Sequence, residues 1–221
     1  MQVSIGLIIE DVHFQGRQLQ WLLGDFPPLV EHFDELVQHI ISKQIILVAS
    51  DGSYVKDGWA SVGWALYEPY KECDDVRRIV PSVKVLFGST ILVDGLLDSN
   101  SAYRAEAVGI FTVTIVLHFL GLYLEQQQID TSLICDNEGL VKCIKKYTNY
   151  DTKHITPDMT EANIILPTIH FYKHLNYNIE WHRGHVERQK KDGQQWTTQE
   201  ATNAAVEELA GRARDEAFVE V

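Results

Sequence analysis

Hydrophobic residues recur with helical spacing in the first part of the chain. After Pro28, apolar side chains return every three or four positions as far as Ile41. This spacing places them on one face of a helix that begins near the prolines. The polar face of this helix is acidic, so we expect the helix to pack on a protein core and not on an anionic membrane.

Short runs of branched apolar residues then predict strands. The first strand begins at Gln44 and ends at Asp51, and two more cover residues 58–68 and 82–93. The remaining predicted elements are a helix over 101–124, a strand over 132–136, a helix over 137–146, a helix over 160–175, a strand over 177–181 and a helix over 199–217. A capping-box pattern at Thr197–Glu200 marks the start of the last helix.

The order of these elements predicts how the strands pair. Three early strands with short connections favour an antiparallel meander, whereas strands that alternate with helices favour parallel pairing through right-handed crossovers. The predicted organisation is an N-terminal helical extension over residues 1–43, one α/β domain over 44–216 and a short tail over 217–221. A chain of 221 residues is long enough for one sizeable core.

Composition and charge narrow the class of protein. Hydrophobic residues make up 45% of the chain and charged residues 23%, as in ordinary globular proteins. We expect no membrane span, because no run approaches about 18 apolar residues. The N-terminus lacks a secretory pattern and the three cysteines are not clustered, so an intracellular location, cytoplasmic or nuclear, with reduced thiols is expected. The net charge of −12 argues against indiscriminate nucleic-acid binding but does not exclude a nuclease.

Three acids stand out by their positions in the predicted elements. Asp51 and Asp136 each end a predicted strand, and Glu106 lies in the first turns of the long helix between small residues. Any one of them has an ordinary explanation as a cap, a turn residue or a surface charge. Together they lie where the predicted sheet would bring them close to one another.

Clustered carboxylates predict a metal site. Close carboxylates repel, so one takes up a proton unless cations neutralise them. Hard oxygen ligands suit Mg²⁺ or Mn²⁺. Two such ions about 4 Å apart can activate water and stabilise the leaving oxygen of a phosphodiester. The pattern therefore indicates phosphoryl transfer.

Five segments in order resemble the motifs of a ribonuclease H domain: Ser50–Ser53, Tyr103–Glu106, Ile134–Asn137, Trp181–His185 and Asn203–Ala210. The similarity is greatest to the domain that follows reverse transcriptase in retroelement polyproteins, and it covers about residues 44–216. It implies an α/β ribonuclease H-like fold with a five-stranded mixed sheet, three strands antiparallel and then two parallel, and helices on both faces. Residues 1–43 would then connect to an upstream reverse transcriptase domain.

The resemblance also implies an activity and a set of residues for it. The activity is hydrolysis of the RNA strand of RNA–DNA hybrids with two Mg²⁺ or Mn²⁺ ions per site. Asp51, Glu106 and Asp136 match the first three metal-binding acids, and Glu207 matches the fourth. His185 matches a mobile-loop histidine that helps product leave or moves a proton. The residues expected to contact substrate are Gly52, Ser53, Arg104, Asn137, Arg183 and Asn203.

Several positions depart from the family pattern. The fourth acid is usually Asp, and Glu207 is longer by one methylene; Glu208 is a competing assignment. Ala102 and Tyr103 stand where cellular members often carry asparagines that read the hybrid, and the loop after His185 is enlarged. Substrate reading is therefore less well defined by the sequence than metal binding.

Two other functions remain open. A catalytically degenerate domain of the same fold could bind nucleic acid or protein. A different enzyme on this fold, such as a 3′-exonuclease or a DNA-strand-transfer enzyme, is the third hypothesis, although the Gly-His loop followed by Asn and an acid argues against it.

Some further patterns have simpler explanations. The His182 and His185 pair has no third zinc ligand nearby. Lysines at 142, 145 and 146 are expected on a solvated helix face, whereas the basic run from Arg183 to Lys191 is the better nucleic-acid contact. Trp59 and Trp64 are expected in the core.

Overall fold

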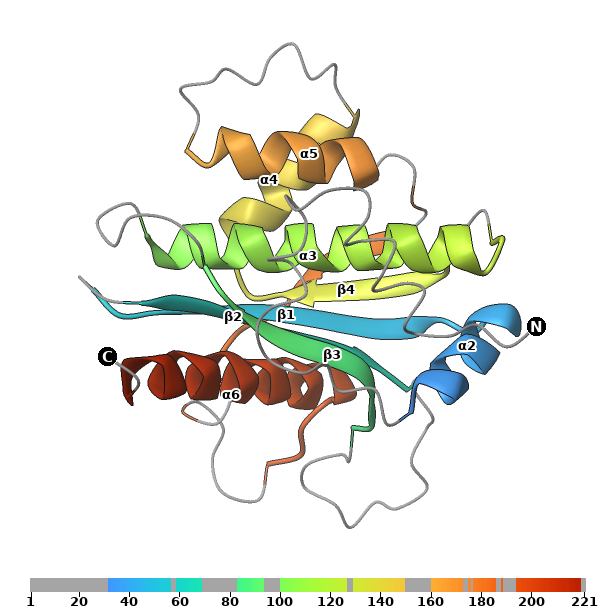
Figure 1. The fold of residues 1–221 in the computed structure, drawn as a ribbon, viewed down its shortest axis with the longest axis horizontal. Coiled ribbons are helices and arrows are strands. Elements are labelled where there is room, and N and C mark those ends of the chain that lie inside the picture. Colours follow the sequence, from blue (N-terminus) through green and yellow to red (C-terminus); the bar gives the residue numbers. More distant parts are fainter. Residues whose placement is uncertain are drawn as a thin grey trace.

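The computed structural model describes residues 32–56, 59–68, 83–93, 100–126, 129–149, 160–172, 175, 177–185, 188 and 194–219. Most of the predicted N-terminal extension lies outside these ranges, as do Lys190 and Lys191 of the basic loop. The described elements follow the predicted order of strands and helices, starting from a helix before the first strand (Figure 1).

A mixed sheet of five strands forms the centre of the fold. Its strands are β1 (Ile46–Tyr54), β2 (Ala60–Tyr67), β3 (Val85–Leu92), β4 (Thr131–Cys135) and β5 (Tyr177–Trp181), arranged in the order β3-β2-β1-β4-β5. The first three strands pair antiparallel, and β4 pairs parallel with both β1 and β5. Both pairing predictions are confirmed, and β1 lies in the middle of the sheet.

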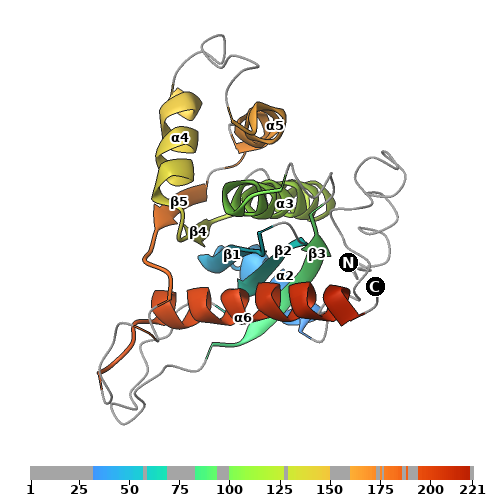
Figure 2. The ribbon, with the colours of Figure 1, turned by 90° about the vertical axis from the view of Figure 1, so that its left-hand side faces the viewer.

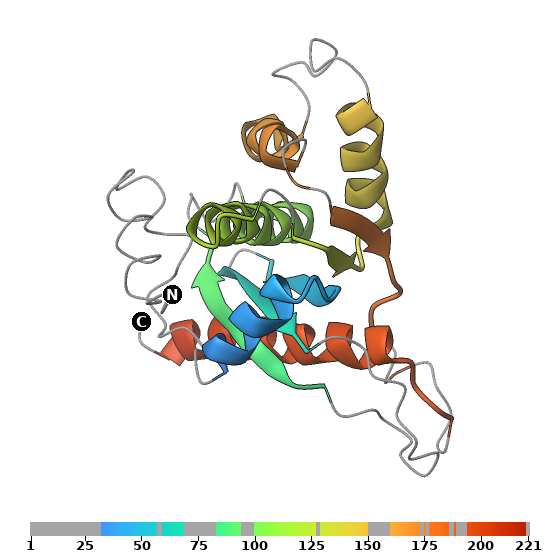
Figure 3. The ribbon, with the colours of Figure 1, turned by 90° about the vertical axis from the view of Figure 1, so that its right-hand side faces the viewer.

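Helices cover both faces of the sheet. Figures 2 and 3, from opposite ends of the molecule, show α3 (Ala102–Tyr123) on one face and α6 (Thr198–Val219) on the other. The helices α4 (Glu138–Asn149) and α5 (Ala162–Tyr172) stack outside α3. The fold therefore has its apolar core in two layers, one on each side of the sheet.

Helix α3 is the main core helix. Ser101 caps its start, since the Ser101 side chain accepts a hydrogen bond from the Arg104 N–H at 3.0 Å. The expectation that no segment is long and apolar enough to span a membrane is wrong for α3. By length and composition alone, this helix could cross a membrane. However, 89% of its apolar window is buried inside the fold, because α3 packs between the sheet and α5. Its hydrophobic character therefore serves the protein core.

Alternation along β1 supplies both core layers. Ile46 and Val48 point into the layer that contains α3, whereas Leu47 and Ala49 point into the layer that contains α6. Helix α6 comes very close to β2 at Gly63, where an added Cβ would lie 2.5 Å from the Val206 carbonyl oxygen. A buried strand with no side chain at this point lets the helix lie directly on the sheet.

The predicted start of α6 is confirmed in detail. The Thr197 N–H donates to Glu200 Oε2 at 2.7 Å, and the Glu200 N–H donates to Thr197 Oγ1 at 3.2 Å. These reciprocal bonds form a capping box, which satisfies backbone donors that a helix start leaves free. The cap fixes where α6 begins and hence which of its side chains face the sheet.

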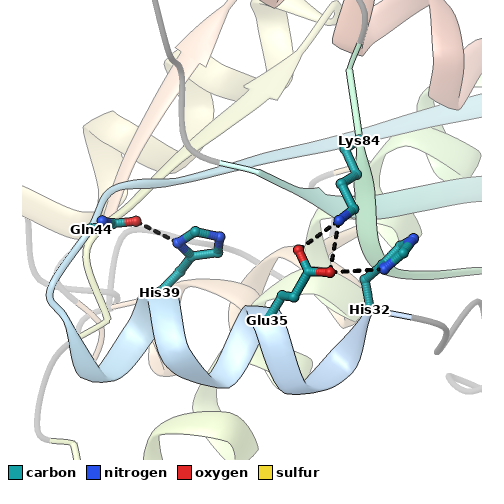
Figure 4. Close-up of polar contacts among 5 residues, drawn as sticks. All are labelled: His32, Glu35, His39, Gln44 and Lys84. Carbon is teal, nitrogen blue, oxygen red and sulfur yellow. Dashed lines mark hydrogen bonds and ion pairs between the residues drawn. The ribbon is translucent and has the colours of Figure 1, made fainter.

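Helix α2 (Phe33–Ile41) packs against the same core as the sheet. The rings of Phe33 and Phe87 meet edge to face with centroids 5.5 Å apart. On the surface, Lys84 donates to both Glu35 oxygens at 2.6 and 2.7 Å, and His32 contacts the same carboxylate (Figure 4). Residues 33–41 are thus joined to β3, and the predicted domain division at residue 43 stays a prediction.

Candidate metal centre

Asp51 lies in the central strand of the sheet and is buried. The sequence predicted that the first strand ends there, and that position is wrong: β1 continues to Tyr54 because it still pairs with β2, with Asp51 opposite Gly63. The parallel ladder with β4 ends earlier, at Ala49. Asp51 therefore stands just beyond the end of the β1–β4 pairing, where side chains from neighbouring elements can reach it.

Glu106 reaches the same place from α3. The Gly52 N–H donates to Glu106 Oε1 at 3.1 Å, so the backbone of β1 holds this carboxylate. The approach requires glycine, because a Cβ at Gly52 would lie 2.6 Å from the Glu106 nitrogen. The structure thus gives Gly52 a use inside the site, and its predicted contact with substrate stays a prediction.

Asp136 follows β4 directly, and its carboxylate lies beside that of Glu106, with the Cys135 thiol close to both. Ligand atoms of Glu106, Cys135 and Asp136 all lie within 4.8 Å of one another. Cys135 Sγ donates to Glu106 Oε2 at 3.8 Å and itself accepts from the Asn137 N–H at 3.4 Å. Cys135 is fully buried, and no sequence pattern indicated that its sulfur lies among the acids.

The fourth predicted acid also belongs to this group. The charge of Glu207, on α6, raises the pKa of Asp51, and a Glu207 carboxylate oxygen contacts Nδ1 of His185. Glu208 instead lies exposed and pairs with Arg212 at 3.1 Å. Of the two competing assignments, the geometry therefore favours Glu207.

Burial and mutual repulsion govern the protonation of these acids. Burial, followed by the charges of Asp136 and Glu207, raises the pKa of Asp51 to about 8. Burial, followed by the charges of Asp51 and Asp136, also raises the pKa of Glu106 well above its usual value. The Gly52 N–H opposes both shifts but does not cancel them. Such a buried, mutually repelling set of carboxylates fits a hard divalent cation, which would neutralise it.

The loop after β5 lies against the acids. At Gly184 an added Cβ would clash with the Asp136 carboxylate, so this turn rests directly on that side chain. The next residue, His185, has a left-handed backbone with φ of 53° and contacts Glu207. His182 pairs instead with Glu180 at 3.3 Å. The two histidines therefore have separate partners, and the structure brings no zinc-like pair together.

Several residues predicted to bind substrate have partners within the protein. Arg104 Nη1 donates to Glu161 Oε2 at 2.5 Å, and both side chains are largely buried. Ser53 Oγ accepts from Arg214 at 2.8 Å. The Asn137 side chain caps α4 by accepting from the Leu140 N–H at 3.0 Å. These three side chains thus have structural roles that their sequence motifs do not reveal.

The other two predicted substrate residues differ in exposure. Arg183 is exposed on the loop after β5. Asn203 is buried on α6 one turn before Glu207, and its Oδ1 has no hydrogen-bond partner among the described residues. A buried amide oxygen without a partner is costly, so its place one turn before Glu207 calls for a polar group that the described part of the chain does not provide.

Trp181 is a further site residue that sequence reasoning assigned only to a motif. Its indole Nε1 donates to the Asp136 backbone oxygen at 2.9 Å. The side chain is nevertheless 45% exposed. Its position four residues before His185 was visible in the sequence, but no periodicity could show that the ring turns back to Asp136.

Comparison with known proteins gives likenesses in structure alone. No family model matches the chain, and no curated protein matches it in sequence. The chain resembles the protease–reverse transcriptase of prototype foamy virus, with a TM-score of 0.53 and 15% identity. It also resembles LC9-RNase H1, a type 1 RNase H with the type 2 active-site motif, with a TM-score of 0.52 and 9% identity. The fold is ribonuclease H-like.

The extent of these likenesses differs between the solved structures. The match to LC9-RNase H1 covers 78% of this chain and 73% of that protein. The match to the foamy virus protein covers 76% of this chain but 20% of the viral chain, so the likeness spans about a fifth of it. RNase H1 of the halophilic archaeon Halobacterium salinarum NRC-1 gives a TM-score of 0.49 and 14% identity, over 77% of this chain and 98% of that one. The predicted ribonuclease H-like fold class is confirmed.

Proposed function

We propose that this protein is a metal-dependent endonuclease that hydrolyses the RNA strand of RNA–DNA hybrids. One observation carries the proposal: Asp51, Glu106, Asp136 and Glu207 lie on or directly after four different elements and form one group of interacting carboxylates on a ribonuclease H-like fold, with Asp51 and Glu106 buried. A structural role gives no reason to gather repelling acids in the interior, whereas a divalent cation does.

The residues of the chain have distinct parts in this proposal. Asp51 and Asp136 would hold two Mg²⁺ or Mn²⁺ ions, with Glu106 and Glu207 completing the site. When bound, the ions supply a more acidic water and stabilise the charge on the leaving oxygen. The half-exposed imidazole of His185, beside Glu207, is placed to accept or release a proton at the edge of the site. Arg183, on the same loop, is placed to contact a phosphate.

The wider setting belongs to the same proposal. The likeness to part of a protease–reverse transcriptase supports a role in a retroelement reverse-transcription apparatus, with residues 1–43 leading from an upstream polymerase domain. Such a protein works on nucleic acid inside the cell, in the cytoplasm or nucleus. No membrane partner is proposed, because the helix of sufficient length and hydrophobicity, α3, is buried in the core.

Cleavage of a labelled RNA–DNA hybrid tests the proposal. Wild type, Asp136→Asn and the exposed control Glu208→Gln are incubated with the hybrid and Mg²⁺ or Mn²⁺. We expect metal-dependent cutting of the RNA strand by wild type and the control, and loss of cutting in Asp136→Asn. Folded wild-type protein that leaves the RNA intact with either metal would contradict the proposal. Cutting of an all-DNA duplex would instead favour a different nuclease on this fold.

A catalytically degenerate domain is the second candidate. The observation that favours it is the contact between Glu207 and His185, because this contact gives the fourth acid a partner within the protein in place of a metal. This alternative predicts binding of the hybrid without cleavage. Restoring the usual residue with Glu207→Asp then separates the two cases, since a regained cut would show that the remaining site is intact.

A further inference from the structure

Trp181 combines exposure with a fixed orientation beside the acids. The described residues include five exposed large apolar side chains: Ile41, Ile45, Val55, Leu122 and Trp181. Trp181 alone among them hydrogen-bonds the backbone of a proposed metal ligand, through its indole N–H and the Asp136 carbonyl. This bond uses one edge of the indole, while 45% of the side chain stays open to solvent.

The strand and the hydrogen bond together set the direction of the ring. Trp181 is the last residue of β5 and lies opposite Cys135 in the parallel ladder, while the His182 N–H donates to the Cys135 carbonyl at 3.0 Å. The backbone on both sides of Asp136 is thus tied to β5. Because the ring is already oriented, a ligand that packs on it would not have to order it, which lowers the entropic cost of binding.

The surroundings favour a nucleotide as that ligand. Two residues further on, Arg183 is exposed and can meet a phosphate, and Gly184 rests on the Asp136 carboxylate. An exposed aromatic residue, an exposed cation and a glycine that lies against one of the acids therefore follow one another within four residues of the chain. Aromatic rings bind nucleotides of any sequence because every base has a flat face, and cations contact the backbone alongside.

We propose that Trp181 is a nucleic-acid contact of this site, whose exposed indole surface packs on the nucleotide next to the phosphate that the acids engage. The inference rests on the proposed function and adds a residue that positions the strand. The indole N–H holds the Asp136 backbone, and the open face holds the nucleotide. One side chain thereby couples the position of the substrate to the position of Asp136, a proposed metal-binding residue.

Two substitutions separate these two roles. Trp181→Phe keeps an aromatic face but removes the N–H donor, whereas Trp181→Leu removes both. Trp196→Phe is the matched control, since Trp196 lies in the segment before α6 and has no assigned role in the site. All are made in a Glu106→Gln background, so that hybrid binding can be measured with Mg²⁺ present and without cleavage. Circular dichroism and thermal melting establish that each variant is folded.

The first measurement is the affinity for a fluorescently labelled RNA–DNA hybrid by anisotropy. We expect Trp181→Leu to raise Kd about 5- to 100-fold, the range for loss of one aromatic contact with a base. Trp181→Phe should stay within a few-fold of its parent, and Trp196→Phe should match the parent. Binding of an unlabelled hybrid should quench the intrinsic tryptophan fluorescence of the parent protein. This quenching should be absent in Trp181→Phe and should persist in Trp196→Phe.

The second measurement is Mn²⁺ affinity without nucleic acid, by calorimetry in an otherwise wild-type background. Both Trp181 variants should bind Mn²⁺ more weakly than wild type, because the Asp136 carbonyl has lost its donor, while Trp196→Phe should not. A hybrid with an abasic position near the cut identifies the contact: quenching that is lost assigns a base, and quenching that persists assigns a sugar. Either result supports the proposal.

The outcomes distinguish this inference from the function on which it rests. If wild type cleaves the hybrid and folded Trp181→Leu binds it with unchanged Kd, the inference is wrong and the proposed function stands. If Trp181→Phe loses affinity as fully as Trp181→Leu, the ring acts only through Asp136 and the stacking contact is wrong. If wild type neither binds nor cleaves any hybrid, both proposals fall.

Discussion

His185 Nδ1 contacts the Glu207 carboxylate and so joins the loop after β5 to helix α6. The extra methylene of Glu207, relative to the Asp that is usual in ribonuclease H domains, extends the reach of this carboxylate. Glu207 therefore has two possible partners, the imidazole and a cation among the other acids. The two compete for the same carboxylate.

Removal of His185 should release Glu207 for metal. We expect His185→Ala to bind Mn²⁺ up to about five-fold more tightly, since an exposed ion pair contributes roughly 0.2–1 kcal/mol. Glu207→Gln should weaken Mn²⁺ binding by about 10- to 100-fold. Isothermal titration calorimetry measures both, with the exposed Glu208→Gln as control. Equal Mn²⁺ affinity in wild type and Glu207→Gln would show that Glu207 does not contribute to metal binding.

The stability of the metal-free protein should fall as pH rises from about 4 to 8. The pKa of Asp51 is about 8 in the folded state and 3.8 as its ordinary value, so between these limits the folded state keeps a proton that the unfolded state has lost. Asp51→Asn removes the part of this dependence that Asp51 contributes, while burial still raises the pKa of Glu106, and it should stabilise the metal-free protein at pH 7 by about 1–3 kcal/mol. Urea unfolding in EDTA at several pH values measures the difference.

Added Mg²⁺ is the control for that pH series. A metal that binds the folded site and not the unfolded chain should stabilise wild type at pH 7 and leave Asp51→Asn nearly unchanged. A wild-type stability in EDTA that rises between pH 5 and 8 would show that Asp51 is not held in a repelling, buried environment.

Gly184→Ala should disturb the site without unfolding the protein. The new Cβ cannot be accommodated beside the Asp136 carboxylate, so the loop or the carboxylate must move. We expect Mn²⁺ affinity and hybrid cleavage to fall about 10-fold or more, with little change in melting temperature. Gly211→Ala is the matched control, because nothing lies within 4 Å of its added Cβ and it should stabilise α6 by up to about 1 kcal/mol. Unchanged metal affinity in Gly184→Ala would show that this turn does not position the Asp136 carboxylate.

The ion pair between Arg104 and Glu161 should contribute to stability. It joins the start of α3 to the turn before α5, with side chains 19% and 11% exposed. Glu161→Gln should lower the free energy of unfolding by about 1–3 kcal/mol, because a charge-assisted bond is lost in a largely buried place. Glu138→Gln, which breaks the exposed pair with Lys142, should cost less than about 0.5 kcal/mol. The urea unfolding midpoints of the two variants measure these losses of stability. Equal losses would show that the Arg104–Glu161 pair contributes no more than an exposed pair, which would leave Arg104 available for substrate.

Local patterns predicted the elements and how the strands pair, whereas the ribonuclease H-like fold class was predicted from the family resemblance. Branched apolar runs marked each strand, and the change from short connections to intervening helices indicated which strands pair antiparallel and which parallel. The capping box at Thr197–Glu200 located the start of α6. The end of β1 was misplaced because Asp-Gly is usually a turn, whereas here the β2 ladder continues past Asp51 to Tyr54.

The site was only partly visible in the sequence. Strand ends and small flanking residues indicated Asp51, Glu106 and Asp136, because those signals are local. The direction of a side chain toward a distant element leaves no such signal. Arg104 was predicted to meet substrate yet pairs with Glu161, and Trp181 turns back to the Asp136 carbonyl. Both facts depend on how the fold brings together residues that are far apart in the chain.

The distribution of the four acids over β1, α3, β4 and α6 determines when the site can form. During synthesis, a chain that ends before α6 has β1 but lacks Glu207, the partner of His185, and the helix that covers the Leu47 and Ala49 face of the sheet. The nascent protein therefore cannot assemble the full carboxylate group on any partial fold. During synthesis beside abundant RNA, the carboxylate group therefore stays incomplete until α6 has emerged from the ribosome and docked on the sheet.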